Sequence, residues 1–134
     1  MPSELFVVGL SWRSASVSIR EKLAFHDEEL ESHLQSLVSH ELIDEAVILS
    51  TCNRVEIYGC TSWTAPASAV AHAAAETRAF ISQSRGYPAE KLSNVLFEHH
   101  EQDAIRHIFR VASALDSMVV GESQILGQLK SAFG

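Results

Sequence analysis

The sequence predicts an α+β fold: a ferredoxin-like βαββαβ sandwich with a four-stranded antiparallel sheet, helices on one face, and additional C-terminal helices. Two observations support it. Short apolar runs alternate with segments whose apolar residues recur at helical spacing. The two central runs, 46–49 and 55–60, are separated only by a polar stretch, which indicates a hairpin. With 134 residues, 46% of them hydrophobic, we expect residues 1–134 to form one domain.

The first half of the chain contains a strand, two helices and then the hairpin. Residues 5–10 form an apolar run and predict the first strand. Charged residues between apolar ones predict a short helix over 17–25. Asp27 is expected to cap a second helix that ends near residue 39. The alternation within 55–60 indicates that one face of that strand is exposed.

The second half is expected to be mainly helical. The predicted elements are an alanine-rich helix over 64–84 with Pro66 in its first turn, a fourth strand over 91–97, a helix over 101–115, a break at 116–117, and a final helix from 122 or 123. The last helix stops at Gly134, and we expect the chain to be a fragment of a longer protein.

Composition excludes several classes of protein. A net charge of −7 argues against nucleic-acid binding through a globally basic surface. No apolar run reaches the roughly 18 residues of a membrane span, and no signal peptide is evident. The cysteines, Cys52 and Cys60, are close in sequence, and we expect reduced thiols and a cytoplasmic location. No zinc motif occurs, so no metal is expected.

Cys52 is the first candidate site residue. It lies at the predicted hairpin tip, where Arg54 supplies positive charge and Thr51 and Asn53 supply hydrogen-bond donors, as a nucleophilic thiol requires. A small apolar cysteine at a strand end is equally compatible with this spacing. Cys60 has no cationic neighbour in sequence and is expected to be structural.

His107 is the second candidate. It lies one helical turn after Asp103, which could orient an acid or base histidine, although a structural histidine is the common alternative. His99 and His100 could pair locally or, less simply, hold a metal. A convergent group of polar residues would suit a small zwitterion such as an amino acid. These residues are Arg54, Ser117, Glu122 and Gln124.

Three segments carry a family resemblance. "VVGLSWRSASVSIREKLAF" (7–25), "LSTCNRVEIY" (49–58) and "HIFRVASALDSMVVGESQILGQLKSAF" (107–133) resemble, in this order, the glutamyl-tRNA reductases, which open the C5 route to 5-aminolevulinate and tetrapyrroles. The resemblance implies that this chain is the N-terminal catalytic domain. It further implies separate NADPH-binding and dimerisation domains, a homodimer, and glutamate-1-semialdehyde aminomutase as a partner.

The resemblance also implies roles for individual residues. Cys52 would attack the ester of glutamyl-tRNA to form a thioester, which NADPH bound by another domain reduces to glutamate-1-semialdehyde. His107 would act as general acid or base. Residues expected to hold the glutamate or lie near the pocket are Thr51, Arg54, Ser117, Glu122 and Gln124. No Gly-x-Gly-x-x-Gly motif occurs in this chain, so we expect it to lack reduction by itself.

Four positions depart from the family's pattern. Trp12 stands where the family usually has His, Ser16 and Ser123 where it has Pro, and Ala114 where it has Gly. The alternative hypothesis is a divergent, non-catalytic module that binds tRNA, the aminomutase or haem. Haem ligation would use histidine and cysteine side chains such as those of His99, His100 and Cys52.

Overall fold

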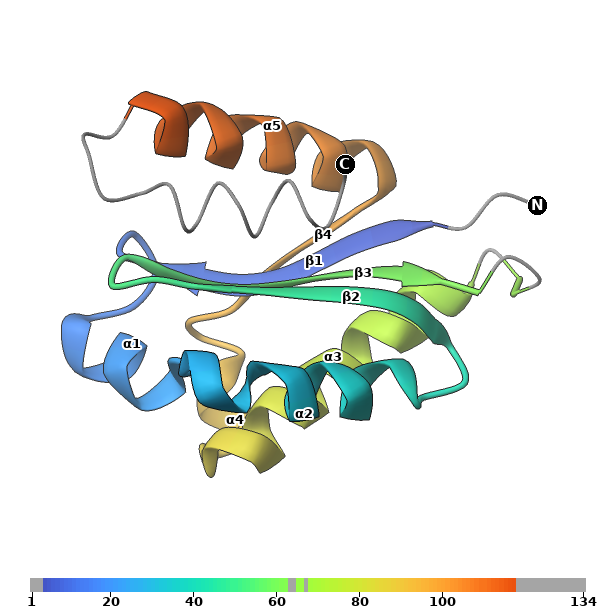
Figure 1. Ribbon diagram of the computed structural model, residues 1–134, viewed down its shortest axis with the longest axis horizontal. Coiled ribbons are helices and arrows are strands. Elements are labelled where there is room, and N and C mark those ends of the chain that lie inside the picture. Colours follow the sequence, from blue (N-terminus) through green and yellow to red (C-terminus); the bar gives the residue numbers. More distant parts are fainter. Residues whose placement is uncertain (1–3, 63–64, 67, 118–134) are drawn as a thin grey trace.

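A four-stranded antiparallel sheet organises the structure, a computed structural model that describes residues 4–62, 65–66 and 68–117 (Figure 1). The strand order is β2-β3-β1-β4. The strands are β1 (Leu5–Ser11), β2 (Ile43–Ser50), β3 (Arg54–Thr61) and β4 (Phe97–His100). Every neighbouring pair is antiparallel, and β2 and β3 form a hairpin. This order confirms the predicted ferredoxin-like sheet.

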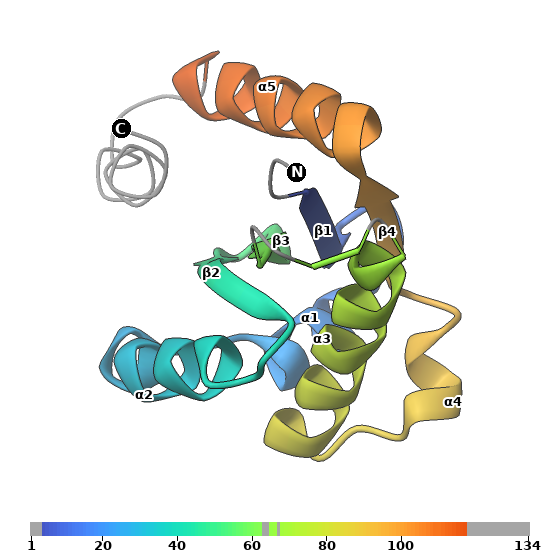
Figure 2. The same ribbon diagram turned by 90° about the vertical axis from the view of Figure 1, so that its right-hand side faces the viewer.

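The helices within the predicted βαββαβ unit lie on one face of the sheet, as expected, and an additional C-terminal helix covers the other face (Figure 2). The helices are α1 (Val17–Leu23), α2 (Asp27–Val38), α3 (Ala69–Arg85), α4 (Ala89–Leu92) and α5 (Glu101–Ser117). Of the helices that the structure describes, the first four lie on one side of the sheet and α5 lies on the other (Figure 1). The chain changes sides directly after β4, where Glu101 takes a left-handed backbone conformation with φ of 52°.

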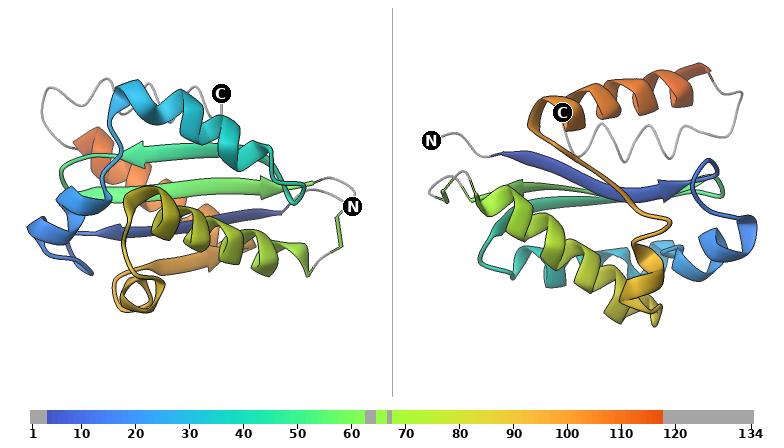
Figure 3. Two further views of the ribbon diagram at one scale, coloured as in Figure 1. Left: turned by 90° about the horizontal axis from the view of Figure 1, so that it is seen from below. Right: turned by 180° about the vertical axis from the view of Figure 1, so that it is seen from behind.

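The larger core lies between the sheet and α1–α4. Alternate residues of β1 and β3, including Phe6, Leu10 and Ile57, point into it and are fully buried. Helices α2 and α3 lie across this face (Figure 3). Helix α3 ends at Arg85, one residue after the predicted end, and Gly86 forms a left-handed C-cap with φ of 64°.

The smaller core lies between the sheet and α5. Val7, Leu49 and Tyr58 from three strands pack against Ala104 and Val111 of α5. The amphipathic spacing of α5 needs such a partner surface. The sequence predicted an exposed face for β3, but α5 covers that face and buries it.

Several element boundaries differ from prediction. His26 caps α2 in place of Asp27, because its backbone N–H donates to the carboxylate of Glu29. Helix α3 begins only at Ala69, whose N–H donates to the carbonyl oxygen of Pro66, so Pro66 precedes the helix and does not stand in its first turn as predicted. The predicted strand over 91–97 is largely α4 and a turn.

The last element that the structure describes is α5. Helix α5 starts where predicted and continues through 116–117, where a break was expected. The final helix expected from 122 or 123 lies outside the described residues. None of the helices that the structure describes has the length and apolar character needed to cross a membrane.

Candidate active site

Cys52 lies on a tight, exposed turn between β2 and β3. The backbone N–H of Thr51 donates to the carbonyl oxygen of Arg54 over 2.8 Å and closes the turn around Cys52 and Asn53. The Oγ1 of Thr51 accepts hydrogen bonds from the N–H groups of Asn53 at 3.0 Å and Arg54 at 3.2 Å. The Cys52 thiol is free and exposed, as predicted. The hydroxyl of Thr51 therefore shapes the backbone that presents the thiol.

Arg20 ties this turn to the rest of the fold. Its Nε donates to the carbonyl oxygen of Cys52 at 3.1 Å, and its NH1 donates to the carbonyl oxygen of Ala15 at 2.7 Å. The N–H of Trp12 donates to the carbonyl oxygen of Asn53 at 2.8 Å. The segment that follows β1, helix α1 and the Cys52 turn are thus held together at one end of the sheet.

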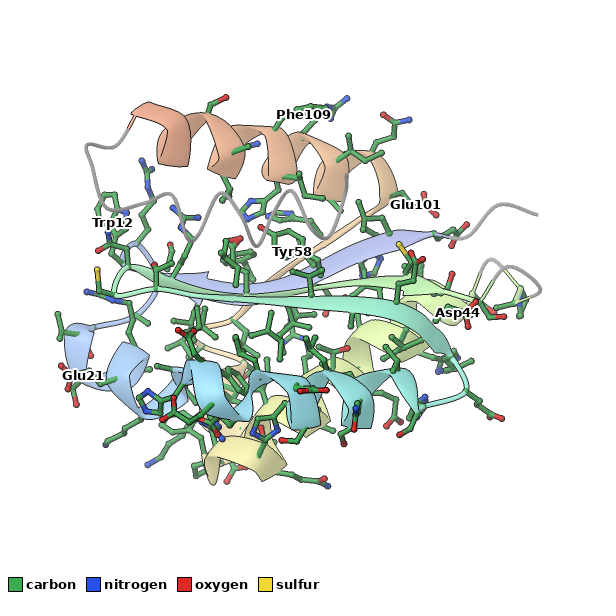
Figure 4. The ribbon with its side chains drawn as sticks, viewed as in Figure 1. Trp12, Glu21, Asp44, Tyr58, Glu101 and Phe109 are labelled. Atoms are coloured by element: carbon green, nitrogen blue, oxygen red, sulfur yellow. The ribbon has the colours of Figure 1, made fainter. Side chains whose placement is uncertain are left out.

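A buried carboxylate, Glu56, lies between the sheet and α5. Its side chain is 0% exposed and accepts hydrogen bonds from three side chains. Nε2 of His107 lies 3.1 and 3.0 Å from its two oxygens, and NH1 of Arg54 lies 3.1 Å from Oε2. The hydroxyl of Tyr58 donates to Oε1. We call these four residues the Glu56 cluster (Figure 4 shows Tyr58 between the sheet and α5).

The protonation state of the Glu56 cluster follows from these contacts. Burial would raise the pKa of Glu56, but the hydrogen bonds from His107 and Tyr58 and the charge of Arg54 outweigh it and hold the pKa below its usual value. Burial and the adjacent carboxylate raise the pKa of Tyr58, which stays a hydrogen-bond donor. An ionised carboxylate only accepts, so Nε2 of His107 must carry a proton. In the neutral imidazole the lone pair is therefore on Nδ1.

Gly9 makes room for this carboxylate. It pairs with Glu56 in the register of β1 and β3. A Cβ atom at Gly9 would lie 2.6 Å from the carbonyl oxygen of Val55 and 2.9 Å from Cα and Cγ of Glu56. Glycine is required here because the Glu56 side chain lies directly against the β1 backbone.

The predicted partner of His107 is wrong. Asp103 pairs with Arg106 on the exposed side of α5, while His107 turns toward Glu56 on the neighbouring layer. His107 contacts the rings of Phe97 and His99, with centroids 4.9 and 5.1 Å away. Burial, and then the charge of His107, lower the pKa of His99.

His99 and His100 do not form a metal pair. They are consecutive on β4 and point to opposite faces, so His99 faces His107 while His100 pairs with Glu98 on the side of α3. Within the residues that the structure describes, no group of three or more histidine, cysteine or acidic side chains could hold a metal ion.

The structure brings together only part of the predicted site. Arg54 and His107 meet at Glu56, and Thr51 and Cys52 share the turn. Ser117 ends α5, and its side chain is not among those described; Glu122 and Gln124 lie outside the described residues. Sequence reasoning missed Glu56 and Tyr58 because their alternation on β3 was interpreted as an exposed face. The signal that the sequence offered for Glu56 was Gly9 on the neighbouring strand β1, because a glycine inside a strand often marks the close approach of another group.

Comparison with known proteins identifies the family. The family model described as the N-terminal domain of glutamyl-tRNAGlu reductase matches residues 8–134. The glutamyl-tRNA reductase of Geobacter sulfurreducens is 51% identical over 130 residues, which cover 97% of this chain and 29% of that protein. The glutamyl-tRNA reductase of Carboxydothermus hydrogenoformans is 42% identical over 96% of this chain and 27% of that protein.

A solved structure agrees. Glutamyl-tRNA reductase from Methanopyrus kandleri matches with a TM-score of 0.62 and 31% identity, over 96% of this chain and 27% of that one. The chain therefore spans less than a third of the length of these relatives. The resemblance noted in the sequence is confirmed. The chain belongs to the family of glutamyl-tRNA reductase N-terminal domains.

Proposed function

We propose that this chain is the catalytic domain of a glutamyl-tRNA reductase and transfers the glutamyl group of glutamyl-tRNA to Cys52. The observation that supports it most is the free, exposed thiol on a hydrogen-bonded turn, followed two residues later by the partly buried Arg54 of the Glu56 cluster. A mobile or buried thiol would suit neither attack nor substrate access.

The proposed step is an acyl transfer. The Cys52 thiolate attacks the ester carbonyl, the sulfur–carbon bond forms, the ester carbon–oxygen bond breaks, and the ribose hydroxyl of the tRNA leaves with a proton. An aminoacyl ester is already activated, so a good nucleophile and correct orientation are the main requirements.

Two members of the Glu56 cluster would serve this step. Arg54 gives NH1 to Glu56, and the guanidinium has further N–H donors for the side-chain carboxylate of the substrate. His107 is oriented by Glu56 and would move a proton at Nδ1, as donor to the leaving oxygen or as acceptor from the thiol. Glu56 itself acts through its neighbours.

Reduction of the thioester to glutamate-1-semialdehyde needs a hydride donor, which we propose is NADPH, as the family resemblance implies. The sequence has no glycine-rich phosphate-binding motif of the Gly-x-Gly-x-x-Gly type, so the residues present do not fit this cofactor. We therefore assign no part of the hydride step to this chain and propose that another domain binds NADPH.

The remaining assignments are proposals that rest on the family resemblance. They are glutamate binding by Thr51, Ser117, Glu122 and Gln124, homodimerisation through another domain, delivery of the product to glutamate-1-semialdehyde aminomutase, and a cytoplasmic location. Copurification of the full-length protein with the aminomutase would test the partner; separate elution of the two proteins at micromolar concentration would argue against it.

The acyl-transfer proposal is tested with radiolabelled glutamyl-tRNA. The 134-residue chain should release tRNA and retain label that acid precipitation recovers with the protein. A Cys52→Ser variant should lose both signals, whereas Cys60→Ser, the matched control at the half-buried cysteine, should keep them. Equal labelling or deacylation by Cys52→Ser would show that Cys52 is not the nucleophile.

A further inference from the structure

Trp12 is an exposed aromatic side chain beside the Cys52 turn. It is 55% exposed, and the guanidinium of Arg13 lies over its ring, 4.9 Å from the centroid. Figure 4 shows Trp12 at one end of the sheet, on the side that carries α5. Large aromatic side chains are more often buried, so an exposed one with a cation on its ring is a candidate contact surface.

The position of Trp12 is fixed by the backbone. Its N–H donates to the carbonyl oxygen of Asn53, the residue next to Cys52. The turn that carries Trp12 is closed by the N–H groups of Ser14 and Ala15, which donate to the carbonyl oxygen of Ser11. An aromatic group on such a turn is preorganised and loses little conformational entropy on binding a ligand.

The same end of the molecule carries positive charge in an otherwise acidic chain. The net charge of the whole chain is −7. The segment from Ser11 to Leu23 nevertheless contains Arg13, Arg20 and Lys22 against a single acid, Glu21. Arg20 is engaged with the backbone of Cys52 and Ala15 and holds the surface together, while Arg13 and Lys22 are exposed. A local basic surface can bind phosphate even where the net charge is negative.

We propose that Trp12 and Arg13, which we call the Trp12 platform, bind the unpaired 3′-terminal nucleotide of an aminoacylated RNA. This inference rests on the proposed function. The scissile ester is on the ribose of the terminal nucleotide, so attack by Cys52 places that nucleotide's base beside the Cys52 turn. One face of the indole stacks with the base, and Arg13, on the other face, contacts the adjacent phosphate.

The first test compares two acyl donors. Trp12→Ala should lower kcat/KM for acyl transfer from glutamyl-tRNA by about 5- to 100-fold relative to kcat/KM for a small glutamyl ester without a nucleotide. Trp12→Phe should recover most of this ratio, because phenylalanine still stacks. Val17→Ala, a matched change at another exposed apolar residue, should leave the ratio unaltered. An unaltered ratio in Trp12→Ala would overturn the proposal while leaving Cys52 as the nucleophile.

The second test needs no chemistry. In a Trp63→Phe variant, Trp12 is the only tryptophan of the chain. A short single-stranded oligoribonucleotide ending in cytidine-cytidine-adenosine should quench its fluorescence saturably, and Arg13→Gln should weaken the binding and its salt dependence. Quenching in a protein that fails to form an acyl-enzyme would support the platform and reject the proposed function. Absence of quenching, or stronger quenching by NADPH than by the oligoribonucleotide, would overturn the platform.

Discussion

Replacing Glu56 with glutamine should destabilise the protein severely, although the two side chains have almost the same shape. The carboxylate accepts hydrogen bonds from His107, Arg54 and Tyr58, and its side chain is 0% exposed. Hydrogen bonds to a charged group contribute about 1.5–3 kcal/mol each. An amide presents two N–H donors to neighbours that are themselves donors.

The expected loss in the free energy of unfolding is about 3 kcal/mol at pH 7, at the lower end of what removal of one member of a buried charged pair costs. The shape is retained and the amide oxygen still accepts, which limits the loss. Urea denaturation followed by circular dichroism measures it, with Glu21→Gln as a control at an exposed carboxylate of α1. A change below about 0.5 kcal/mol, typical of surface substitutions, would refute the structural role of the Glu56 cluster.

Three further predictions follow from the same contacts. The pKa of Glu56 is lower in the folded state than in the unfolded state, so ionised Glu56 stabilises the fold fully above its unfolded pKa of about 4.3 and loses this effect as pH falls further. The difference in unfolding free energy between the parent and Glu56→Gln should therefore narrow below that pH, and a difference that widens would contradict this reasoning. Gly9→Ala should lower the free energy of unfolding by about 3 kcal/mol or more, because the new Cβ would lie 2.6 Å from a backbone oxygen. Gly86→Ala, in open space at φ 64°, should lower it by only about 1 kcal/mol, and thermal denaturation that ranks the two variants in reverse would disprove this reasoning. Iodoacetamide at pH 8 should label Cys52 at least about tenfold faster than Cys60, because burial raises the pKa of Cys60. Equal labelling rates, measured by peptide mass spectrometry, would contradict this prediction.

Local signals explain what could be predicted from the sequence. The hairpin around Cys52 was predictable because two apolar runs are joined by only a few polar residues. The end of α3 was predicted at residue 84 and lies at Arg85, because glycine, here Gly86, is the residue type that most favours the left-handed conformation of a C-cap. The fourth strand was misplaced because a short apolar run does not separate a strand from a buried turn of helix, and Leu92 and Val95 are buried in α4 and the turn after it.

The Glu56 cluster could not be predicted from the sequence, because its contacts depend on tertiary structure. Whether one face of β3 is exposed depends on where α5 packs, and the chain crosses to that face only at Glu101. Asp103 was a reasonable partner for His107 by helical spacing, but the side chain that reaches Nε2 comes from β3, 51 positions away in sequence. Helical spacing identifies neighbours on one helix and carries no information about the strand packed beneath it.

The atom that receives the glutamyl group is the most direct test of the proposed function. The 134-residue chain can be mixed with glutamyl-tRNA, quenched in acid and digested, and the peptides mapped by mass spectrometry. We predict one glutamyl group, released by neutral hydroxylamine as a thioester should be, on the peptide that contains Cys52 and absent from the Cys52→Ser variant. A glutamyl group on Cys60, on a lysine, or on no residue while tRNA is still deacylated would contradict the assignment of Cys52 as the nucleophile.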